Sequence, residues 1–459
     1  MANTSIDGLV SGLNTSALIS QLMQVEAAPQ TALKNKVTVG NKAVSAYQNV
    51  NTKMAAVVTA AKALGNADTW GSLAATSSSD AAVATTTTGG MSGSITFKVD
   101  RLAAAHTVMF GDTVSSTTED DVMSVDEFDV LLSDGSTATV SPANRSLQAV
   151  VNAINSTEDA AYRAAAVQVA PGEYTLQLTA VATGADAVFA DVPVDIELGT
   201  TTIATQGTDA RILVGTTNPY AITSASNTFT DVLPGLTLNV NRAQGATDAP
   251  VTVKVSSDTD AITAKAQSLV DSVNAALSEI TAQSRQKNGT VAAGPLAGDS
   301  ALRKLSGDLL SAVSGGAGDL GSLSQVGITL TRGGTLAFDA AKFKEALAAD
   351  PAKTRSFFDT YTNVPHAKAT TGYNPGWDDA DGVARKLETI GLYATEGISL
   401  PNDPVGKARQ GILAGLIQRR TEAVRGLTEQ VEAWDVRLEL RQTALQRQFS
   451  TLETSLSKL

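Results

Sequence analysis

The sequence predicts an α+β multidomain protein in which terminal coiled-coil helices and a helical domain enclose inserted β-rich domains. Three observations predict this class. Apolar residues recur in steps of three and four near both ends of the chain, and they alternate in short runs through its middle. The chain has 459 residues, which is too long for a single hydrophobic core. We therefore expect helices at the two ends and strands between them.

The composition excludes several kinds of site. The chain has no cysteine, so it has no disulfide, thiolate metal ligand or cysteine nucleophile. No run of about 18 apolar residues occurs, which predicts no membrane insertion. The N-terminus lacks the basic start and the continuous apolar stretch of a Sec-type signal peptide. If the protein leaves the cell, we expect another export route.

Charge is unevenly distributed along the chain. Residues 1–64 hold five Lys and two acidic residues, and residues 407–459 hold nine Lys or Arg and six acidic residues. The net charge of the whole chain is −12, so the acidic excess lies between these two segments. An acidic middle disfavours nucleic acid and anionic membranes as partners, and its simplest interpretation is solubility.

A long helix is predicted near the N-terminus. Pro29 suits a first helical turn, and the helical spacing continues to about Leu64. The apolar residues form a narrow seam on one side of this helix, which is typical of helix–helix pairing. The seam residues that we assign to coiled-coil pairing or oligomerisation are Leu33, Val37, Val44, Tyr47 and Met54.

The same spacing returns at the C-terminus, where residues 405–459 are predicted to be helical. The second set of seam residues is Val424, Leu427, Val431, Trp434, Leu438, Leu445, Phe449, Leu452 and Leu456. The seam position after Leu438 is the charged Arg441, and the pattern then resumes with a shift, which is a stutter. Either the helix unwinds locally there, or Arg441 extends its head group to solvent. Two distant seams predict a structural subunit that assembles rather than an enzyme.

Short strands are predicted between the two ends. Ile95, Phe97 and Val99 alternate as in a half-buried strand. Further strand-like runs lie at 128–140, 174–181, 192–198, 222–243 and 249–258, with one amphipathic helix among them at 146–155.

Helices and one hairpin are predicted after these strands. The hairpin is at 327–339, where Ile328 and Leu330 would face Leu336 and Phe338 across a glycine turn. Helices are expected at about 259–286, 296–314, 340–350 and 383–398, with Asp258 or Thr259, Asp299 or Ser300, and Asp339 as N-caps of the first three. Residues 360–382 are predicted to be a loop.

Candidates for catalysis are few. The chain has two histidines, His106 and His366, and neither has a neighbouring serine elbow or a second ligand in the sequence. A catalytic histidine needs such a positioned partner, so we interpret both as surface or loop residues. We predict no catalytic residue, no cofactor-binding residue and no cofactor.

One spacing is similar to a calcium-binding loop. Asp379, Asp381, Gly382 and Glu388 fall at EF-hand positions, but the first ligand position is Trp377, which cannot coordinate calcium. We therefore predict no metal site and interpret the segment as an acidic solvated turn.

Five segments of the chain resemble the flagellar filament-capping protein family, also called flagellar hook-associated protein 2. They are IDGLVSGLNTSALISQLMQVEAAP (6–29), GSITFKVDRLAAAHTV (93–108), SNTFTDVLPGLTLNV (226–240), GITLTRGGTLAFDAAKFKEAL (327–347) and RLELRQTALQRQFSTLETSLSKL (437–459). The first and last segments are the most specific, because they are the self-assembly ends of that family.

The resemblance implies a nested architecture, and the order of the predicted elements gives a similar layout. We expect a terminal coiled-coil leg at 1–42 and 420–459, a helical domain with a β-hairpin at 43–70 and 256–419, a β-rich domain at 71–115 and 201–255, and an outer inserted α+β domain at 116–200.

The resemblance also implies a function. Proteins of this family form a structural cap at the distal end of the bacterial flagellar filament and promote the folding and insertion of exported flagellin. The implied partners are other copies of the chain in a homo-oligomeric ring of about five subunits, flagellin, hook–filament junction proteins and a flagellar type III export chaperone. The implied location is secreted and extracellular, at the flagellum tip.

Two alternatives from other classes stay open at the level of sequence. The Gly- and Thr-rich strands are compatible with a surface adhesin, although no residue pattern marks a sugar pocket. The hairpin–helix segment also resembles segments of other axial flagellar components, such as a hook–filament junction protein or flagellin. A cap closes into a ring or plate, whereas these axial components extend into tubes.

Overall fold

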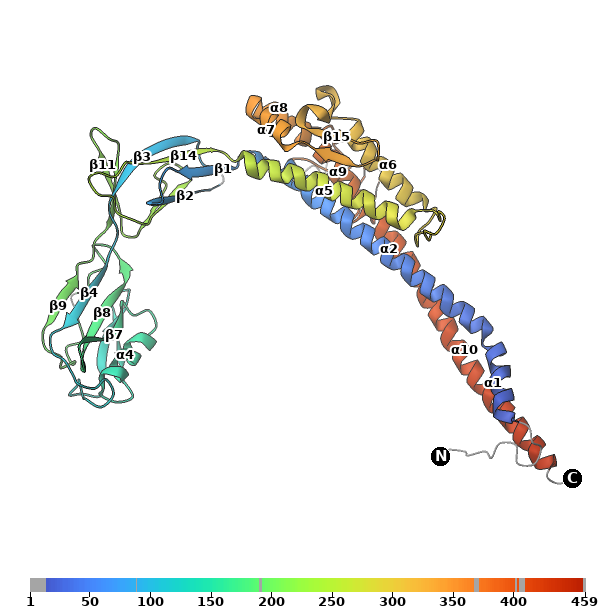
Figure 1. Cartoon of the computed structure of the whole chain (residues 1–459), viewed down its shortest axis with the longest axis horizontal. Coiled ribbons are helices and arrows are strands. Elements are labelled where there is room, and N and C mark those ends of the chain that lie inside the picture. Colours follow the sequence, from blue (N-terminus) through green and yellow to red (C-terminus); the bar gives the residue numbers. More distant parts are fainter. Residues whose placement is uncertain are drawn as a thin grey trace. The chain divides into compact units, whose positions relative to one another are not determined.

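The computed structural model describes residues 14–87, 89–189, 192–366, 371–400, 403 and 409–456. The chain divides into two compact units, one built from both ends of the chain, up to Trp70 and from Thr259, and the other formed by Gly71–Asp258. Helices dominate the first unit and strands the second (Figure 1), which confirms the predicted α+β multidomain class.

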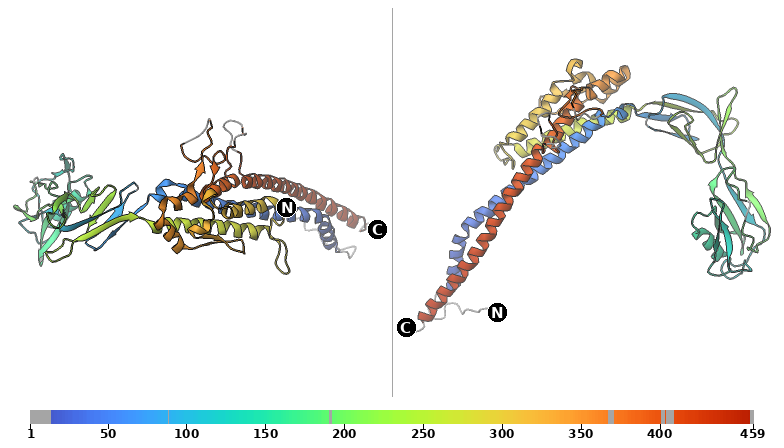
Figure 2. Two further views of the ribbon diagram at one scale, coloured as in Figure 1. Left: turned by 90° about the horizontal axis from the view of Figure 1, so that it is seen from above. Right: turned by 180° about the vertical axis from the view of Figure 1, so that it is seen from behind.

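Three helices bring the two ends of the chain together. They are α1 (Thr15–Glu26), α2 (Ala28–Gly65) and α10 (Ile412–Leu456). α10 lies beside α2 and, toward its own C-terminus, beside α1 (Figures 1 and 2). Pro29 stands in the first turn of α2, as predicted, because its fixed backbone angle suits a helix start.

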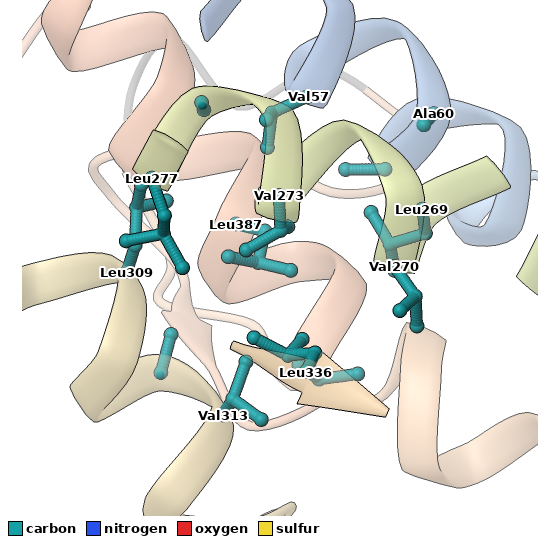
Figure 3. Packing of buried hydrophobic residues seen from close by; sticks show 14 of the residues in the cluster. Val57, Ala60, Leu269, Val270, Val273, Leu277, Leu309, Val313, Leu336 and Leu387 are labelled. Atoms are coloured by element: carbon teal, nitrogen blue, oxygen red, sulfur yellow. The ribbon is translucent and has the colours of Figure 1, made fainter. Parts of the chain in front are cut away.

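The remaining helices of this unit pack against α2 and one another and form its core. Their bounds are α3 (Ala67–Trp70), α5 (Thr259–Ser284), α6 (Ser300–Ser314), α7 (Ala340–Ala349), α8 (Pro351–Asp359) and α9 (Val383–Ala394), with two 3-10 turns at Gly318–Leu320 and Leu323–Val326. Figure 3 shows Val57 of α2, Val273 of α5 and Leu387 of α9 within this core. Asp299 and Asp339 accept hydrogen bonds from the first turns of α6 and α7, so both predicted caps are confirmed.

The predicted hairpin is also confirmed. β15 (Ile328–Leu330) pairs with β16 (Leu336–Phe338), with Ile328 opposite Phe338 and Leu330 opposite Leu336. The side chain of Asn274 in α5 exchanges two hydrogen bonds with the backbone of Leu336, at 2.8 and 2.9 Å, which fixes the hairpin to the helix. Within the predicted loop, β17 (Tyr361–Thr362) pairs with β18 (Asp379–Ala380).

The second unit contains two antiparallel sheets built mainly from the first and last parts of Gly71–Asp258. A five-stranded sheet has the order β1 (Leu73–Ser77), β14 (Val251–Ser257), β3 (Gly93–Arg101), β10 (Ala210–Val214) and β11 (Tyr220–Ser224), and a three-stranded sheet has the order β12 (Thr228–Thr230), β13 (Leu236–Val240) and β2 (Ala82–Thr86). Phe97, Val99 and Leu238 are buried in one core, as their alternation predicted.

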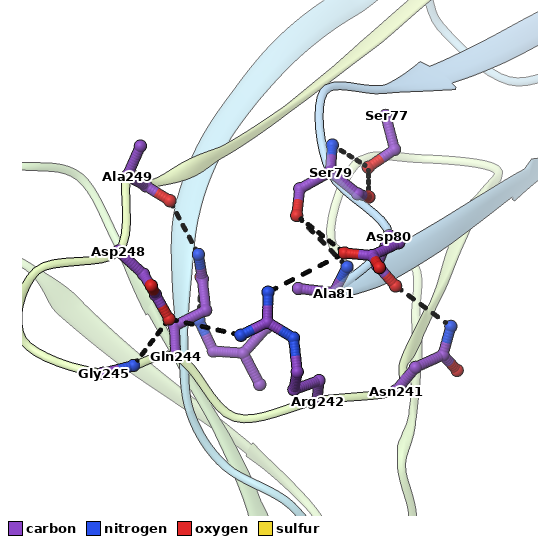
Figure 4. A network of polar contacts seen from close by, with 11 residues as sticks. Ser77, Ser79, Asp80, Ala81, Asn241, Arg242, Gln244, Gly245, Asp248 and Ala249 are labelled. Atoms are coloured by element: carbon purple, nitrogen blue, oxygen red, sulfur yellow. Dashed lines mark hydrogen bonds and ion pairs between the residues drawn. The ribbon is translucent and has the colours of Figure 1, made fainter.

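A polar network ties two loops of these sheets together (Figure 4). Arg242 donates a hydrogen bond to Asp248 at 3.3 Å and lies 3.7 Å from the carboxylate of Asp80. The Gln244 side chain donates to the Ala249 carbonyl at 2.6 Å. Because the charged groups are exposed, their attraction contributes little to stability, and the network mainly orders the loops.

A further four-stranded sheet, called the outer sheet below, has its own hydrophobic core. Its order is β7 (Tyr162–Ala170), β8 (Glu173–Thr183), β4 (Ala105–Phe110) and β9 (Thr201–Thr205), with a separate hairpin of β5 (Phe128–Leu131) and β6 (Thr137–Val140). Helix α4 (Leu147–Ser156) begins after the cap Ser146, close to its predicted start, and buries Val150 and Ile154 beside β7.

Two predictions about this region are wrong. Residues 192–198 form no strand, since Ile196 makes only an isolated bridge to Met123. The range 116–200 is also too narrow for the outer sheet, because β4 and β9 lie on either side of it and pair with each other. The division of the chain into four domains otherwise stays a prediction.

Candidate assembly site at the terminal helices

The helices α2 and α10 run antiparallel to each other. Near the start of α2, the Gln30 side-chain amide donates a hydrogen bond to Asp435, and Lys34 lies 3.9 Å from the same carboxylate. Farther along α2, Gly40 faces Val424. Residue numbers therefore decrease along α10 as they increase along α2. The two helices that carry the predicted seams come from opposite ends of the sequence and lie against each other.

The two helices lie very close to each other at Gly40. A Cβ atom built on Gly40 would lie 2.5 Å from Cγ2 of Val424, which is shorter than any normal contact between carbon atoms. With the Val424 side chain in this position, only a glycine fits at residue 40. Since glycine weakens a helix interior by about 1 kcal/mol relative to alanine, the close approach accounts for a residue that helix propensity disfavours.

The predicted seam residues of α10 are only partly covered. Leu445 is buried, whereas Val424, Leu427, Val431, Trp434, Leu438 and Phe449 are half-buried. Leu452 is 47% exposed. Leu456 ends α10, and its side chain lies outside the described residues. The neighbouring helices α1 and α2 therefore leave much of this seam in contact with solvent.

The predicted seam of α2 divides into two groups. Leu33, Val37 and Val44 are half-buried along the stretch that lies against α10. Tyr47 and Met54 instead belong to the core that α5, α6 and α9 form around α2. The Tyr47 hydroxyl donates to the Asp299 carboxylate at 2.5 Å, and burial together with this contact raises the pKa of Tyr47 to about 12.

Arg441 joins α10 to α1. Its guanidinium donates to the Glu26 carboxylate at 2.9 Å, at the C-terminal end of α1. The break in the seam at Arg441 thus coincides with the change of partner from α2 to α1, since Ala27 separates those two helices. Arg441 has a specific acidic partner in addition to solvent.

Sequence reasoning missed a second apolar stripe on α10. Val436 is 59% exposed and Leu440 is 68% exposed, and both stand on the side of the helix opposite to Trp434 and Leu438. On α1, Leu18, Leu22 and Val25 are likewise exposed at helical spacing. The signal was present in the sequence as a four-residue step from Val436 to Leu440, but it is too short to stand out as a seam.

The two histidines lie in different surroundings. His106 is buried in β4, with its ring 5.1 Å from that of Phe189, so the interpretation of His106 as a surface residue is wrong. His366 stacks on Trp377 with 4.0 Å between ring centres. The Nδ1 atom of His106 accepts a hydrogen bond from the Gly207 N–H at 3.4 Å.

The calcium-like spacing lies at the start of α9. Glu388, its last position, is buried and pairs with Arg385 at 3.0 Å, so this carboxylate is committed to a guanidinium. Arg385 also donates to the Gly65 carbonyl at 2.5 Å and stacks over Tyr373 at 4.7 Å. The solvated-turn interpretation is therefore wrong for Glu388, which belongs to the contact between α2 and α9. Separately, none of the described helices has the length and apolarity of a membrane span.

Two protein families match this chain, one over an N-terminal segment and one over its C-terminal half. The family described as flagellar hook-associated protein 2 C-terminus matches residues 207–459, and the one described as flagellar hook-associated protein 2 N-terminus matches residues 11–106. The flagellar hook-associated protein 2 of Escherichia coli K12 is 28% identical over 380 residues, which cover 76% of this chain and 79% of that protein. A lateral flagellar hook-associated protein 2 of Vibrio parahaemolyticus is 31% identical over 137 residues, or 30% of this chain and 31% of that protein.

A solved structure has the same fold. The D1-D2-D3 domains of the flagellar cap protein FliD from Escherichia coli align with a TM-score of 0.58 and 24% identity, over 82% of this chain and 99% of that one. The C-terminal family match alone covers more than half of the residues, and it includes all of α10. The chain therefore belongs to the flagellar hook-associated protein 2 family.

Proposed function

We propose that this chain caps the distal end of the bacterial flagellar filament and promotes the folding and insertion of exported flagellin. The observation that carries the proposal is the match of the N-terminal and C-terminal family models to both parts of the chain that contribute the paired terminal helices. The family is a structural one, so the proposed role requires no covalent chemistry. The comparisons support a cap rather than an adhesin or another axial component.

The half-exposed seam supports assembly from several copies. In the single chain, Leu452, Val436 and Leu440 remain in contact with solvent, although burying such a side chain is worth about 1.5–3 kcal/mol. Other copies of the chain can cover these residues when a ring forms. We infer a homo-oligomeric ring of about five subunits with closed symmetry, in which 1–42 and 420–459 form the legs.

The remaining partners follow from the same role. A lid at the filament end contacts flagellin below it and meets hook–filament junction proteins before the filament grows. The location is outside the cell at the flagellum tip, which the chain reaches through the flagellar type III route with an export chaperone. No nucleic acid is expected as a partner, because the net charge of the chain is −12.

A deletion strain tests this function. Cells that lack the chain should secrete flagellin monomer into the medium and should not swim, and a plasmid copy of the full chain should restore filaments. Immunoblotting of the medium measures the released flagellin. Normal filaments in the deletion strain would contradict a capping role.

A further inference from the structure

The outer sheet has two edges, and only the β7 edge has backbone groups with partners outside the sheet in the described part of the chain. At the β7 edge, the Asn155 side chain in α4 donates to the Ala164 carbonyl at 2.8 Å and accepts from the Ala164 N–H at 2.9 Å. Just before β7, the Ala161 N–H donates to the Leu131 carbonyl at 2.8 Å. An Asn155 side chain and a neighbouring strand thus satisfy the edge backbone groups of Ala161 and Ala164, at the beginning of β7.

The β9 edge is open. β9 pairs with β4 on one side and is the last strand of the sheet on the other. Within the described part of the chain, no backbone hydrogen bond joins Thr201–Thr205 to anything except β4. The ladder between β4 and β9 is regular from Thr201 to Ile203 and shifts register before Thr205. Since an antiparallel ladder uses alternate residues, the N–H and C=O groups of Thr201–Ile203 that do not face β4 point outward without a backbone partner in the described part of the chain. β9 also has neither Lys nor Pro, the residues that commonly discourage strand addition.

One apolar side chain at this edge is left uncovered on the core face of the sheet. Ile203 stands opposite Val108, and Val108 stands opposite Leu178. Cross-strand partners share a face, so all three belong to the core side. Val108 and Leu178 are buried, whereas Ile203 is 61% exposed. A further strand beside β9 would cover Ile203 and extend the existing core.

The charge of this region favours one kind of occupant. Residues 105–205 hold fifteen Asp and Glu, two Arg and no Lys. Two such acidic sheets repel each other, which disfavours a second copy at β9. A neutral or basic segment with alternating β-branched residues can pair with the unpaired backbone groups of β9, and the negative charge of this region does not repel it.

We propose that β9 accepts an extended, neutral-to-basic segment of a polypeptide that has not yet folded, which adds to the outer sheet as one more strand. Backbone hydrogen bonds make this acceptance tolerant of sequence, and Ile203 provides one apolar contact for an alternate side chain. The inference rests on the proposed function for the identity of that polypeptide, which would be arriving flagellin.

The test uses the full chain and a fluorescein-labelled peptide of alternating threonine and valine with a lysine at each end. A second peptide has the same side chains but is N-methylated at every other backbone amide, which removes ladder donors. We expect fluorescence anisotropy to rise with the first peptide only. Ile203→Thr should weaken binding about tenfold, whereas the control Val169→Thr, which changes a half-exposed residue on the β7 edge, should bind like the unmodified chain.

Several outcomes would overturn the proposal. They are equal binding of the two peptides, equal affinities of the two variants, and undiminished binding of a peptide with glutamate at its ends. Sedimentation velocity adds another: if Ile203→Thr abolishes self-association, a second copy occupies the edge. The deletion strain tests capping independently of the peptide. If the peptide binds but the deletion strain makes normal filaments, only the capping role is rejected. If the deletion strain releases flagellin but the peptide does not bind, only the proposal that β9 accepts a strand is rejected.

Discussion

Gly40 of α2 lies so close to Val424 of α10 that a methyl group at Gly40 would overlap the Val424 side chain, at 2.5 Å from its Cγ2. The two residues are distant in sequence, and their contact lies within the pair of helices that carries both predicted seams.

Gly40→Val should force α2 and α10 apart. The added side chain cannot be accommodated without movement of the Val424 side chain or of a backbone, so overpacking should lower the free energy of unfolding by about 1–3 kcal/mol. Urea denaturation followed by circular dichroism measures the change. Gly426→Ala is the matched control, because a Cβ at Gly426 meets no atom within 4 Å and should stabilise α10 by up to about 1 kcal/mol. Equal destabilisation by both substitutions would contradict the close contact.

Leu452→Asp should weaken assembly while leaving the single chain folded. Leu452 is 47% exposed before assembly, so the substitution removes little from the core, but a buried charge at a helix seam opposes ring formation. Sedimentation velocity and swimming motility measure the effect. Ser450→Asp, also exposed on α10, is the control and should assemble normally. If both variants assemble alike, the seam does not operate between subunits.

Removal of residues 440–459 should abolish motility without unfolding the helical core. The deleted segment carries Leu445, Phe449 and Leu452 but none of the core residues around α5. We expect an unchanged melting transition for the core in calorimetry and no swimming in the complemented deletion strain. Normal swimming of the truncated protein would rule out a need for this end of the leg.

Arg385→Met should destabilise the contact between α2 and α9. The substitution leaves the buried Glu388 carboxylate without its guanidinium and the Gly65 carbonyl without its donor. Removing one partner of such a pair costs about 3–5 kcal/mol. The double variant Arg385→Met with Glu388→Gln should recover part of this loss in urea denaturation. No difference between the single and double variants would exclude the buried pair as the cause.

Stability should fall at alkaline pH partly through Tyr47. The pKa of Tyr47 is raised to about 12 in the folded chain, mainly by burial and further by Asp299, whereas an unfolded tyrosine ionises near pH ~10. The folded state therefore holds the proton more tightly, so this contribution is complete below about pH 10 and is lost as pH rises toward 12. Urea midpoints at pH 9 and 11 should differ less in Tyr47→Phe than in the unmodified chain. An unchanged difference would contradict this role.

Local patterns in the sequence were sufficient to predict many of the helices. Asp299 and Asp339 cap the helices that they were predicted to cap, because a cap depends on neighbours three residues away. The hairpin at Ile328 and Phe338 was likewise predicted, since a glycine turn determines its register. These elements depend on interactions that are close in sequence.

The outer sheet was predicted less well, because its order depends on pairing between distant segments. β9 has no alternating apolar pattern, and only its pairing with β4 makes it a strand. His106 was misplaced for a different reason. It shares a face with Val108 and Phe110, and this two-residue alternation predicts burial. In the terminal seams, the division of Tyr47 and Met54 from Leu33 and Val37 depends on where α5 and α9 pack, which no single helix pattern contains.

The strands β1 and β14 place the beginning and the end of the β unit next to each other, with Leu73 directly opposite Ser257. A cassette whose entry and exit are adjacent can be enlarged, exchanged or trimmed while the flanking helices keep their own partners. The helical unit and the β unit can accordingly diversify at different evolutionary rates.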